Sequence, residues 1–240
     1  MRDHLLDLVS HTLDLGCIDL VKIVGDDKTT TVSGLAEDKS VVLQGEFHAP
    51  VAEFIGTFGM PNLNKLKILL NLQEYKENAK LAITRKSNGG ADGIDFVNDS
   101  GDFRNNYRFM ASEIINEKLK TAKFRGANWN IEFSPSVASI QRLRMQVQAN
   151  AEETVFQAKT EDGHLKFFFG DHSTHAGNFV FQHDVGGTLK RAWSWPVLQV
   201  QGILSLSGDK IMRISDDGAA MIVVDSGLAK YEYILPAQTK

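Results

Sequence analysis

Cysteine is almost absent from this chain, since Cys17 is the only one among 240 residues. One cysteine can form neither an intrachain disulfide nor a cysteine-based zinc site, and such usage is typical of a reducing cytoplasm. A free cysteine is usually a buried and inert thiol. We therefore expect Cys17 to be a core residue, and we expect the protein to work in the cytoplasm.

Long apolar runs are also missing. No stretch reaches 18 consecutive apolar residues, so no transmembrane helix is predicted. Asp3 and Asp7 fall inside what would be the apolar segment of a signal peptide, which argues against export. An apolar content of 42% with 23% charged residues is ordinary for a globular protein with a core, and we expect no membrane partner.

The signatures of common enzyme classes are lacking as well. The chain contains no G-x-x-x-x-G-K phosphate loop, no G-x-G-x-x-G dinucleotide fingerprint and no G-x-S-x-G nucleophile turn. Asp99, Asp102, Asp216 and Asp225 lie near glycines in turn sequences, where aspartate is favoured by its local hydrogen bonding. We predict a protein that is not an enzyme and needs no cofactor.

The richest histidine cluster is His172-Ser173-Thr174-His175, with His183 further along the chain. A metal site needs three or four converging ligands and groups that orient them. Two histidines three positions apart in a loop rich in small residues do not meet this requirement. We expect a solvated loop without metal, and a hydrolase that uses this loop is the enzymatic alternative.

In the first half of the chain, the sequence predicts helices that alternate with groups of short strands. Residues 2–13 carry leucines at helical spacing, and residues 61–77 favour a helix over a strand. A further helix is predicted to follow Pro50 over residues 49–59. The predicted strands are residues 17–24, 29–35, 39–47, 81–85, 93–98 and 104–111.

The second half repeats this order. A helix over residues 134–149 should bury Val137, Ile140, Leu143 and Val147, and this places Arg144 near the apolar face. Glu161-Asp162-Gly163-His164 predicts a hairpin turn. The predicted strands are residues 130–133, 154–159, 165–169, 178–182, 210–215, 219–224 and 230–235.

A second helix of this half is predicted over residues 193–208, with Ser194 ahead of Pro196 as its cap. Pro-Val and a glycine six residues after the proline occur both here and at Pro50, at an offset of 196 − 50 = 146. We infer one unit used twice. Domains are predicted at residues 1–112 and 128–240, joined by an exposed connector at 113–127 that carries Lys118, Lys120, Lys123 and Arg125.

The net charge of −4 argues against a protein that coats nucleic acid with its whole surface. It leaves room for one local basic patch. Basic residues gather on or near predicted helices, whereas the first helix is acidic. These candidates are Arg142, Arg144, Lys190 and Arg191 in the second half, and Lys65 and Lys67 in the first.

The chain resembles the sliding DNA clamps, most closely those of T-even-like phages, including phages that infect cyanobacteria. The resemblance is carried by the repeated helix-strand order, the helix start at 134–140, the hairpin at 154–169, and the segments 193–206 and 225–237. It implies an α+β DNA-clamp fold of two similar domains, each with two helices on antiparallel sheets. Three copies would form a head-to-tail ring whose helices line the hole.

The resemblance also implies a function in viral DNA replication. The ring would be a processivity factor that encircles double-stranded DNA without reading its sequence and tethers the DNA polymerase. A clamp loader would open it with ATP, which the clamp itself does not hydrolyse. Arg142, Lys190 and Arg191 are the best candidates for the DNA channel, followed by Lys65 and Lys67, with Arg144 less favoured.

Partner peptides of this family dock in an apolar pocket beside the C-terminal segment. The matching positions are Phe124, Tyr233, Leu235, Pro236 and Ala237. Tyr233 and Leu235 could equally be core residues of a strand. The alternative to the clamp is a β-rich phage structural or assembly protein whose duplication serves self-association alone.

Overall fold

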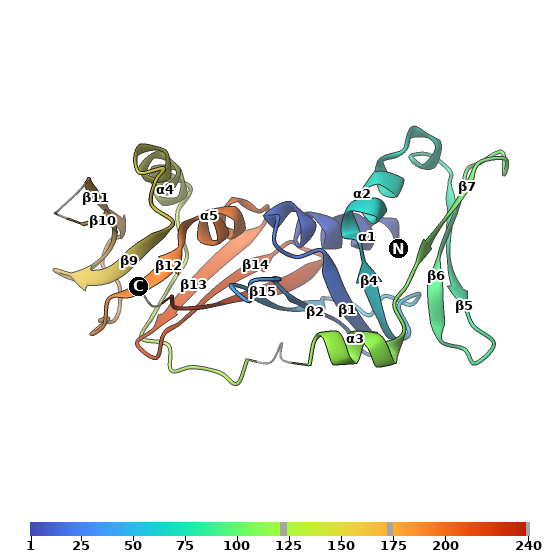
Figure 1. The fold of residues 1–240 in the computed structure, drawn as a ribbon, viewed down its shortest axis with the longest axis horizontal. Helices are drawn as coiled ribbons and strands as arrows, with labels where there is room; N and C mark the ends of the chain where they lie inside the picture. Colours follow the sequence, from blue (N-terminus) through green and yellow to red (C-terminus); the bar gives the residue numbers. More distant parts are fainter. Residues whose placement is uncertain (121–123, 172–174, 239–240) are drawn as a thin grey trace. The chain divides into compact units, whose positions relative to one another are not determined.

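Two packed units make up the chain in a computed structural model, which describes residues 1–120, 124–171 and 175–238 (Figure 1). The first unit consists of Met1–Lys123 together with Ser226–Tyr231. The second consists of Phe124–Asp225 together with Glu232–Lys240. The last strand of the chain therefore begins in the first unit and ends in the second. Within the described ranges, no helix is long and apolar enough to cross a membrane.

The first unit carries two antiparallel sheets and three α-helices. One sheet has the strand order β4-β1-β2-β3, and the other has the order β5-β6-β7. The elements are α1 (Arg2–Ser10), a 3-10 turn (Leu13–Leu15), β1 (Leu20–Gly25), β2 (Thr30–Leu35), β3 (Val42–Phe47), β4 (Gly56–Pro61), α2 (Leu63–Asn71), a 3-10 turn (Gln73–Tyr75), β5 (Lys80–Arg85), β6 (Ala91–Val97), β7 (Arg104–Arg108) and α3 (Ser112–Lys118).

Apolar residues at helical spacing fix α1 and α2 on the first unit. Leu5, Leu8 and Val9 are buried on α1, and α2 buries the leucines at positions 63, 66, 69 and 70. Asn62 begins α2 by accepting the N–H of Lys65 at 3.1 Å, which satisfies one free donor of the first turn. The helix predicted over residues 61–77 is thus confirmed, with shorter bounds.

The second unit repeats this plan. Its strands follow the orders β11-β10-β9-β12 and β15-β14-β13-β8. The elements are β8 (Ile131–Phe133), α4 (Val137–Ala149), β9 (Val155–Glu161), β10 (His164–Gly170), β11 (Ala176–Gln182), β12 (Trp193–Pro196), α5 (Val197–Ser205), β13 (Asp209–Ser215) and β14 (Ala219–Asp225), and then β15 (Ala229–Pro236), which enters this unit at Glu232.

Phenylalanines fill the core beneath the β11-β10-β9-β12 sheet. The rings of Phe167 and Phe181 are stacked at 4.4 Å, and Phe156 lies 4.3 Å from Phe167. The turn between β9 and β10 has positive φ at Asp162 and Gly163, as a two-residue hairpin requires, so this predicted hairpin is confirmed. Ser136 caps α4 by accepting the N–H of Ser139 at 3.0 Å.

The helix predicted after Pro50 is wrong. The Val51 N–H donates to the hydroxyl of Thr30 at 2.9 Å, and the Phe54 N–H donates to the Val51 carbonyl at 2.8 Å. These bonds fold the segment into one turn that buries Phe54, and β4 begins two residues later. A contact with a distant strand thus decides a segment whose local pattern favours a helix.

The helix predicted over residues 193–208 begins later than expected. Residues Trp193–Pro196 form β12, where Ser194 is buried and faces Gln157 of β9. No side chain caps the α5 helix that follows. The offset of 146 is therefore also wrong. Pro61 and Pro196 each end a strand just before a helix, 196 − 61 = 135 positions apart, and the starts of α1 and α4 differ by the same 137 − 2 = 135.

The exposed connector predicted at 113–127 begins as the helix α3. Ile115 on this helix is fully buried, because Gly59 of β4 has no side chain and leaves room for it. Lys118, Lys120 and Arg125 are exposed, as expected, and Lys123 lies outside the described residues. Cys17 is half-buried rather than buried, and burial raises the pKa of its thiol.

Asp7 on α1 holds the segment Ser226–Tyr231 in the first unit. Its carboxylate accepts the Tyr231 hydroxyl at 2.7 Å and the Ser226 hydroxyl at 3.0 Å, and it lies 3.2 Å from the ring of His11. The His11 ring is stacked on the Tyr231 ring at 4.8 Å. Burial alone would raise the pKa of Asp7, but the bonds from His11, Tyr231 and Ser226 together lower it below its ordinary value.

We expect Asp7→Asn to lower the free energy of unfolding at pH 7 by about 1–3 kcal/mol, because buried hydrogen bonds to a charged acceptor are weakened. A depressed native-state pKa stabilises the fold above the ordinary value of 3.8, and this contribution is lost as the pH falls below that value. Urea unfolding at pH 7 and pH 3 measures both effects.

Asp3→Asn is the matched control, because Asp3 is exposed on the same helix. It should change the free energy of unfolding little at either pH. An Asp7→Asn deficit that is equally large at pH 3 and pH 7 would contradict the assigned role of the carboxylate charge.

Candidate nucleic-acid interface and partner surface

The exposed sides of four helices are the candidate DNA-facing surface. Within the first unit α1 packs against α2, and within the second unit α4 packs against α5 (Figure 1). Each of these helices buries one stripe of apolar residues and leaves the opposite side to solvent. The charges on these exposed sides decide what each unit can bind.

The exposed side of α1 is acidic. Asp3 is exposed, and with Asp7 and Asp14 it lines a groove of about 420 Å³ that runs between α1 and α2. The guanidinium of Arg2 donates to the Leu70 carbonyl at the end of α2, so this one cation of α1 is held by its neighbour. The groove is lined by Asp3, Leu6, Asp7, Val9, Ser10, Asp14, Lys67 and Asn71.

Lys65 and Lys67 lie on opposite flanks of α2 and differ in their contacts. The Lys67 ammonium lies 2.6 Å from the Asp14 carboxylate, so its charge is already paired. Lys65 is exposed, and within the described residues its ammonium makes no ion pair. Lys65 is therefore the exposed cation of α1 and α2 that an anionic ligand could use.

Arg142 and Arg144 are both exposed on α4. The Arg142 guanidinium lies 5.5 Å from the centre of the Phe179 ring, which positions it beside β11. Leu143 alone is fully buried on this helix, so the predicted burial of Val137 is wrong, since its side chain is 73% exposed. Arg144, predicted near the apolar face, is exposed. Within the described residues neither arginine forms an ion pair.

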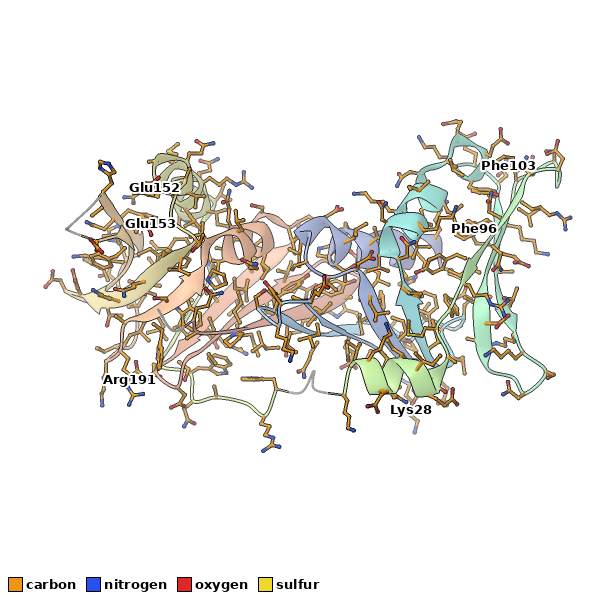
Figure 2. The ribbon with its side chains drawn as sticks, in the orientation of Figure 1. Lys28, Phe96, Phe103, Glu152, Glu153 and Arg191 are labelled. Carbon is orange, nitrogen blue, oxygen red and sulfur yellow. The ribbon has the colours of Figure 1, made fainter. Side chains whose placement is uncertain are left out.

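Lys190 and Arg191 lie in the turn before β12 rather than at the start of α5. Their N–H groups donate to one carboxylate oxygen of Asp216, at 2.9 and 3.2 Å. Figure 2 shows Arg191 on the side of the second unit that is remote from α4 and α5. The assignment of these two residues to a DNA channel stays a prediction, and their surroundings connect them to a different surface.

That second surface is built around Trp193. Its indole N–H donates to the Asp216 carbonyl at 2.8 Å, and the Arg191 guanidinium lies 5.9 Å from its ring centre. Gly218 is close to both this ring and Ala237, and the Ala237 N–H donates to the Gly218 carbonyl at 2.9 Å. We call Trp193, Gly218 and Ala237 the tryptophan surface.

The residues predicted for a partner-peptide pocket divide into two groups. Tyr233 and Leu235 are fully buried in β15, whereas Pro236 is exposed and Ala237 is half-buried. The Phe124 ring is half-buried and lies 6.0 Å from Trp129. The sequence analysis missed Trp193 and Gly218 at this surface, because it assigned the first to a helix and the second only to a turn.

No group of three or more potential metal ligands is present in the described ranges. The predicted cluster falls partly outside them, since His172 is not described and His175 is exposed. His183 lies instead beside His164 of β10, with ring centres 4.9 Å apart, and the His164 ring accepts the Asp184 N–H at 3.1 Å. These contacts stabilise a loop. The expectation that this region binds no metal stays a prediction from the sequence.

The fold is that of the PCNA sliding clamps. PCNA from Thermococcus kodakaraensis superposes with a TM-score of 0.69 and 10% identity, covering 99% of this chain and 97% of that one. A. fulgidus PCNA, in a structure with the C-terminal region of FEN-1 bound, gives 0.72 and 8%, with coverages of 100% and 97%. PCNA from Entamoeba histolytica gives 0.67 and 11%, with coverages of 97% and 94%.

These matches confirm the predicted α+β clamp fold over the whole chain. No protein-family model and no curated protein matches the sequence. At 8–11% identity the likeness is one of fold, and the function rests on the arguments that follow.

We expect Asp216→Ala to lower the free energy of unfolding by about 1–2 kcal/mol, because two backbone N–H groups lose their acceptor. Asp217→Ala is the control, since Asp217 is the exposed neighbour in the same turn. Urea unfolding followed by tryptophan fluorescence measures stability and reports on Trp193 together. Equal stability of the two variants would contradict the role of Asp216 in ordering the tryptophan surface.

Proposed function

We propose that this protein is a sliding clamp of the T-even-like phage type, which encircles duplex DNA and tethers the replicative polymerase. It carries no catalytic site in this proposal, and an ATP-dependent clamp loader opens it in the cytoplasm of an infected cell. The observation that supports the proposal is the superposition of the whole chain on PCNA clamps, with TM-scores of 0.67–0.72. A β-rich assembly protein would have no reason to reproduce both units of a clamp over their full length.

We divide the chain for this function into a clamp domain at residues 1–112, a connector at 113–127 and a second clamp domain at 128–240. The two halves share the order of helix, strands, helix and strands, with helix starts 135 positions apart for α1 and α4. The helix α3 falls at the beginning of the connector and packs on β4 through Ile115.

Ring closure is proposed to use two free sheet edges, one in each unit. At the edge of β5 the Arg85 side chain bonds to the carbonyls of Glu53 and Ile55, and at the edge of β12 Ser194 bridges to Gln238. The opposite edge strands, β7 and β11, pair only on their inner sides, with β6 and β10, in the described part of the chain. Pairing of β7 in one copy with β11 in the next is a head-to-tail contact, which must close into a ring or grow without limit.

The proposed partner site is the tryptophan surface with Pro236 beside it. The A. fulgidus PCNA structure contains a bound C-terminal region of FEN-1, which supports a peptide-binding role for clamps of this fold. Trp193 supplies a half-buried aromatic ring, and Pro236 is exposed at the end of β15. A polymerase or loader segment with an apolar anchor would suit this surface.

The oligomeric state tests the proposal first. We expect a particle of about 80 kDa, three times the chain mass of 26.6 kDa, with a central hole in particle images. Light scattering at micromolar concentration measures the mass. A compact particle without a hole would contradict the proposal.

Asn106→Pro on β7 tests the edge contact. The Phe109 N–H donates to Asp92 of the neighbouring β6, so by alternation the N–H groups of Arg108 and Asn106 point away from β6. A proline at Asn106 removes one outward donor and keeps the inward ladder, so we expect monomers with an intact fold. Asn106→Ala is the matched control, since it keeps the N–H and should remain a trimer. Equal masses for both variants would rule out β7 as the closing edge.

Topological retention tests the DNA function without a loader. Rings that thread onto a linear duplex with biotin at both ends should stay bound in high salt after streptavidin blocks the ends. They should leave the same duplex when the ends are open, because encirclement and not contact affinity holds them. Loss at the same rate from blocked and open duplexes would contradict encirclement.

A further inference from the structure

The cations of the four helices lie on their flanks rather than on their outermost sides. We define the crest of a helix as the residues opposite its buried stripe, at 100° per residue. On α2, with the leucines at 63, 66, 69 and 70 buried, the crest is Asn64, Ile68 and Asn71. Lys65 and Lys67 then lie about 100° to either side of Leu66, one on each flank.

The helix α4 has the same arrangement. Leu143 is its buried residue, and the crest opposite is Ala138, Gln141, Met145 and Gln148, all of them exposed. Arg142 and Arg144 flank this crest on its two sides. Met145 is 65% exposed, so the crest presents an apolar thioether and amides to solvent where a basic helix would present charge.

The crest of α5 carries no charge at all. It consists of Leu198, Gly202 and Ser205, opposite the buried Val197, Val200, Ile203 and Leu204. Leu198 is 73% exposed, and the Ser205 hydroxyl donates back to its own helix at the Gln201 carbonyl. Ile68 on the α2 crest is similarly 49% exposed, and the Asn71 amide donates back to the Lys67 carbonyl.

The crest of α1 differs, because it is acidic. Asp3 is exposed on this crest, opposite the buried Leu5 and Leu8 and beside the acidic groove, whereas the Asp7 carboxylate is bonded to Tyr231 and Ser226. A duplex would be repelled here. In the described residues, the cations of the four helices that are exposed and form no ion pair are Lys65, Arg142 and Arg144, whereas Arg2 is half-buried against Leu70.

We propose that the DNA-facing surface is a neutral track, in which the uncharged crests of α2, α4 and α5 face the duplex and only Lys65, Arg142 and Arg144 meet phosphates. This inference rests on the proposed clamp function and specifies how the duplex is held. Encirclement already prevents loss of the DNA, so the ring needs few of the phosphate contacts whose counterion release gives other DNA-binding proteins their affinity. Phosphate contacts fix the register of a protein on the duplex, whereas exposed apolar and amide groups can contact the DNA without fixing it.

A neutral track has a quantitative signature. Affinity for phosphate backbone falls with salt at a log–log slope of about −0.9 for each neutralised phosphate. Three unpaired cations per subunit therefore limit the slope to about −3 per subunit, and partial engagement makes it shallower. The measurement is the residence time of the ring on an open-ended linear duplex as the salt concentration is raised from about 50 to about 200 mM, the usual range for such slopes.

The decisive variant is Gln141→Lys, which places one cation on the α4 crest without touching a buried residue. We expect the slope to steepen by about 0.9 per subunit, because one further phosphate is neutralised. Ser87→Lys is the matched control, because Ser87 is exposed in the β5–β6 turn, which Figure 1 shows at the end of that sheet away from α2. It adds the same charge and should leave the slope unchanged.

Leu198→Lys on the α5 crest provides an independent second variant. The neutral track is overturned if Gln141→Lys and Leu198→Lys leave the salt slope as unchanged as Ser87→Lys does. It is also overturned if the wild-type salt slope is steeper than about −3 per subunit. These outcomes differ from failure of the clamp function itself. A protein that forms no ring, or is lost equally from blocked and open duplexes, fails the earlier tests before any crest variant is compared.

Discussion

The hydrogen bonds that Asp7 accepts from Tyr231 and Ser226 set the course of the last strand. They hold residues Ser226–Tyr231 in the first unit, where Gly45 of β3 leaves space for the Tyr231 ring. The same strand then runs on to Pro236 and places Ala237 against Gly218 at the tryptophan surface. One carboxylate on a helix therefore fixes the starting point of the segment that ends at the proposed partner site. This also explains why α1 keeps an acid on a side where a DNA-binding helix would carry a base, since Asp7 is needed for the fold.

Periodicity in the sequence predicts the strands and most helices, because alternating burial and leucine spacing are local properties. It fails where a distant contact overrides the local pattern. After Pro50 the chain makes a single turn, in which the Phe54 N–H donates to the Val51 carbonyl and the Thr30 hydroxyl accepts the Val51 N–H. At Trp193 the pairing with β9 extends the strand to Pro196, and the helix starts only afterwards. On α3, Ile115 is buried only because Gly59 lies opposite it, and neither residue alone predicts this contact. The repeat was therefore inferred correctly from the element order and wrongly from the matched prolines.

The candidate site residues show the same limit of sequence-based prediction, because the contacts of their charged groups depend on distant residues. A sequence counts cations, but it does not show which of them are already held by other groups of the protein. Arg2 is held by the Leu70 carbonyl, and Lys67 is paired with Asp14. Lys190 and Arg191 belong to a turn ordered by Asp216. Their neighbour Trp193 becomes a candidate contact only when the fold brings Gly218 and Ala237 to it.

A weakly charged inner surface and an acidic chain are consistent physical requirements for a ring. A protein that binds DNA by contact must gain its affinity from phosphates, so it needs many free cations and its binding falls steeply with salt. A protein that encloses DNA needs only subunit contacts whose lifetime exceeds the time that its partner proteins spend on the DNA. Evolution can then place charge where folding needs it, as at Asp7, and leave leucine, isoleucine and methionine on helix crests. On this argument, the stability of the β7–β11 contact, rather than the number of basic residues, sets how long the proposed clamp stays on DNA.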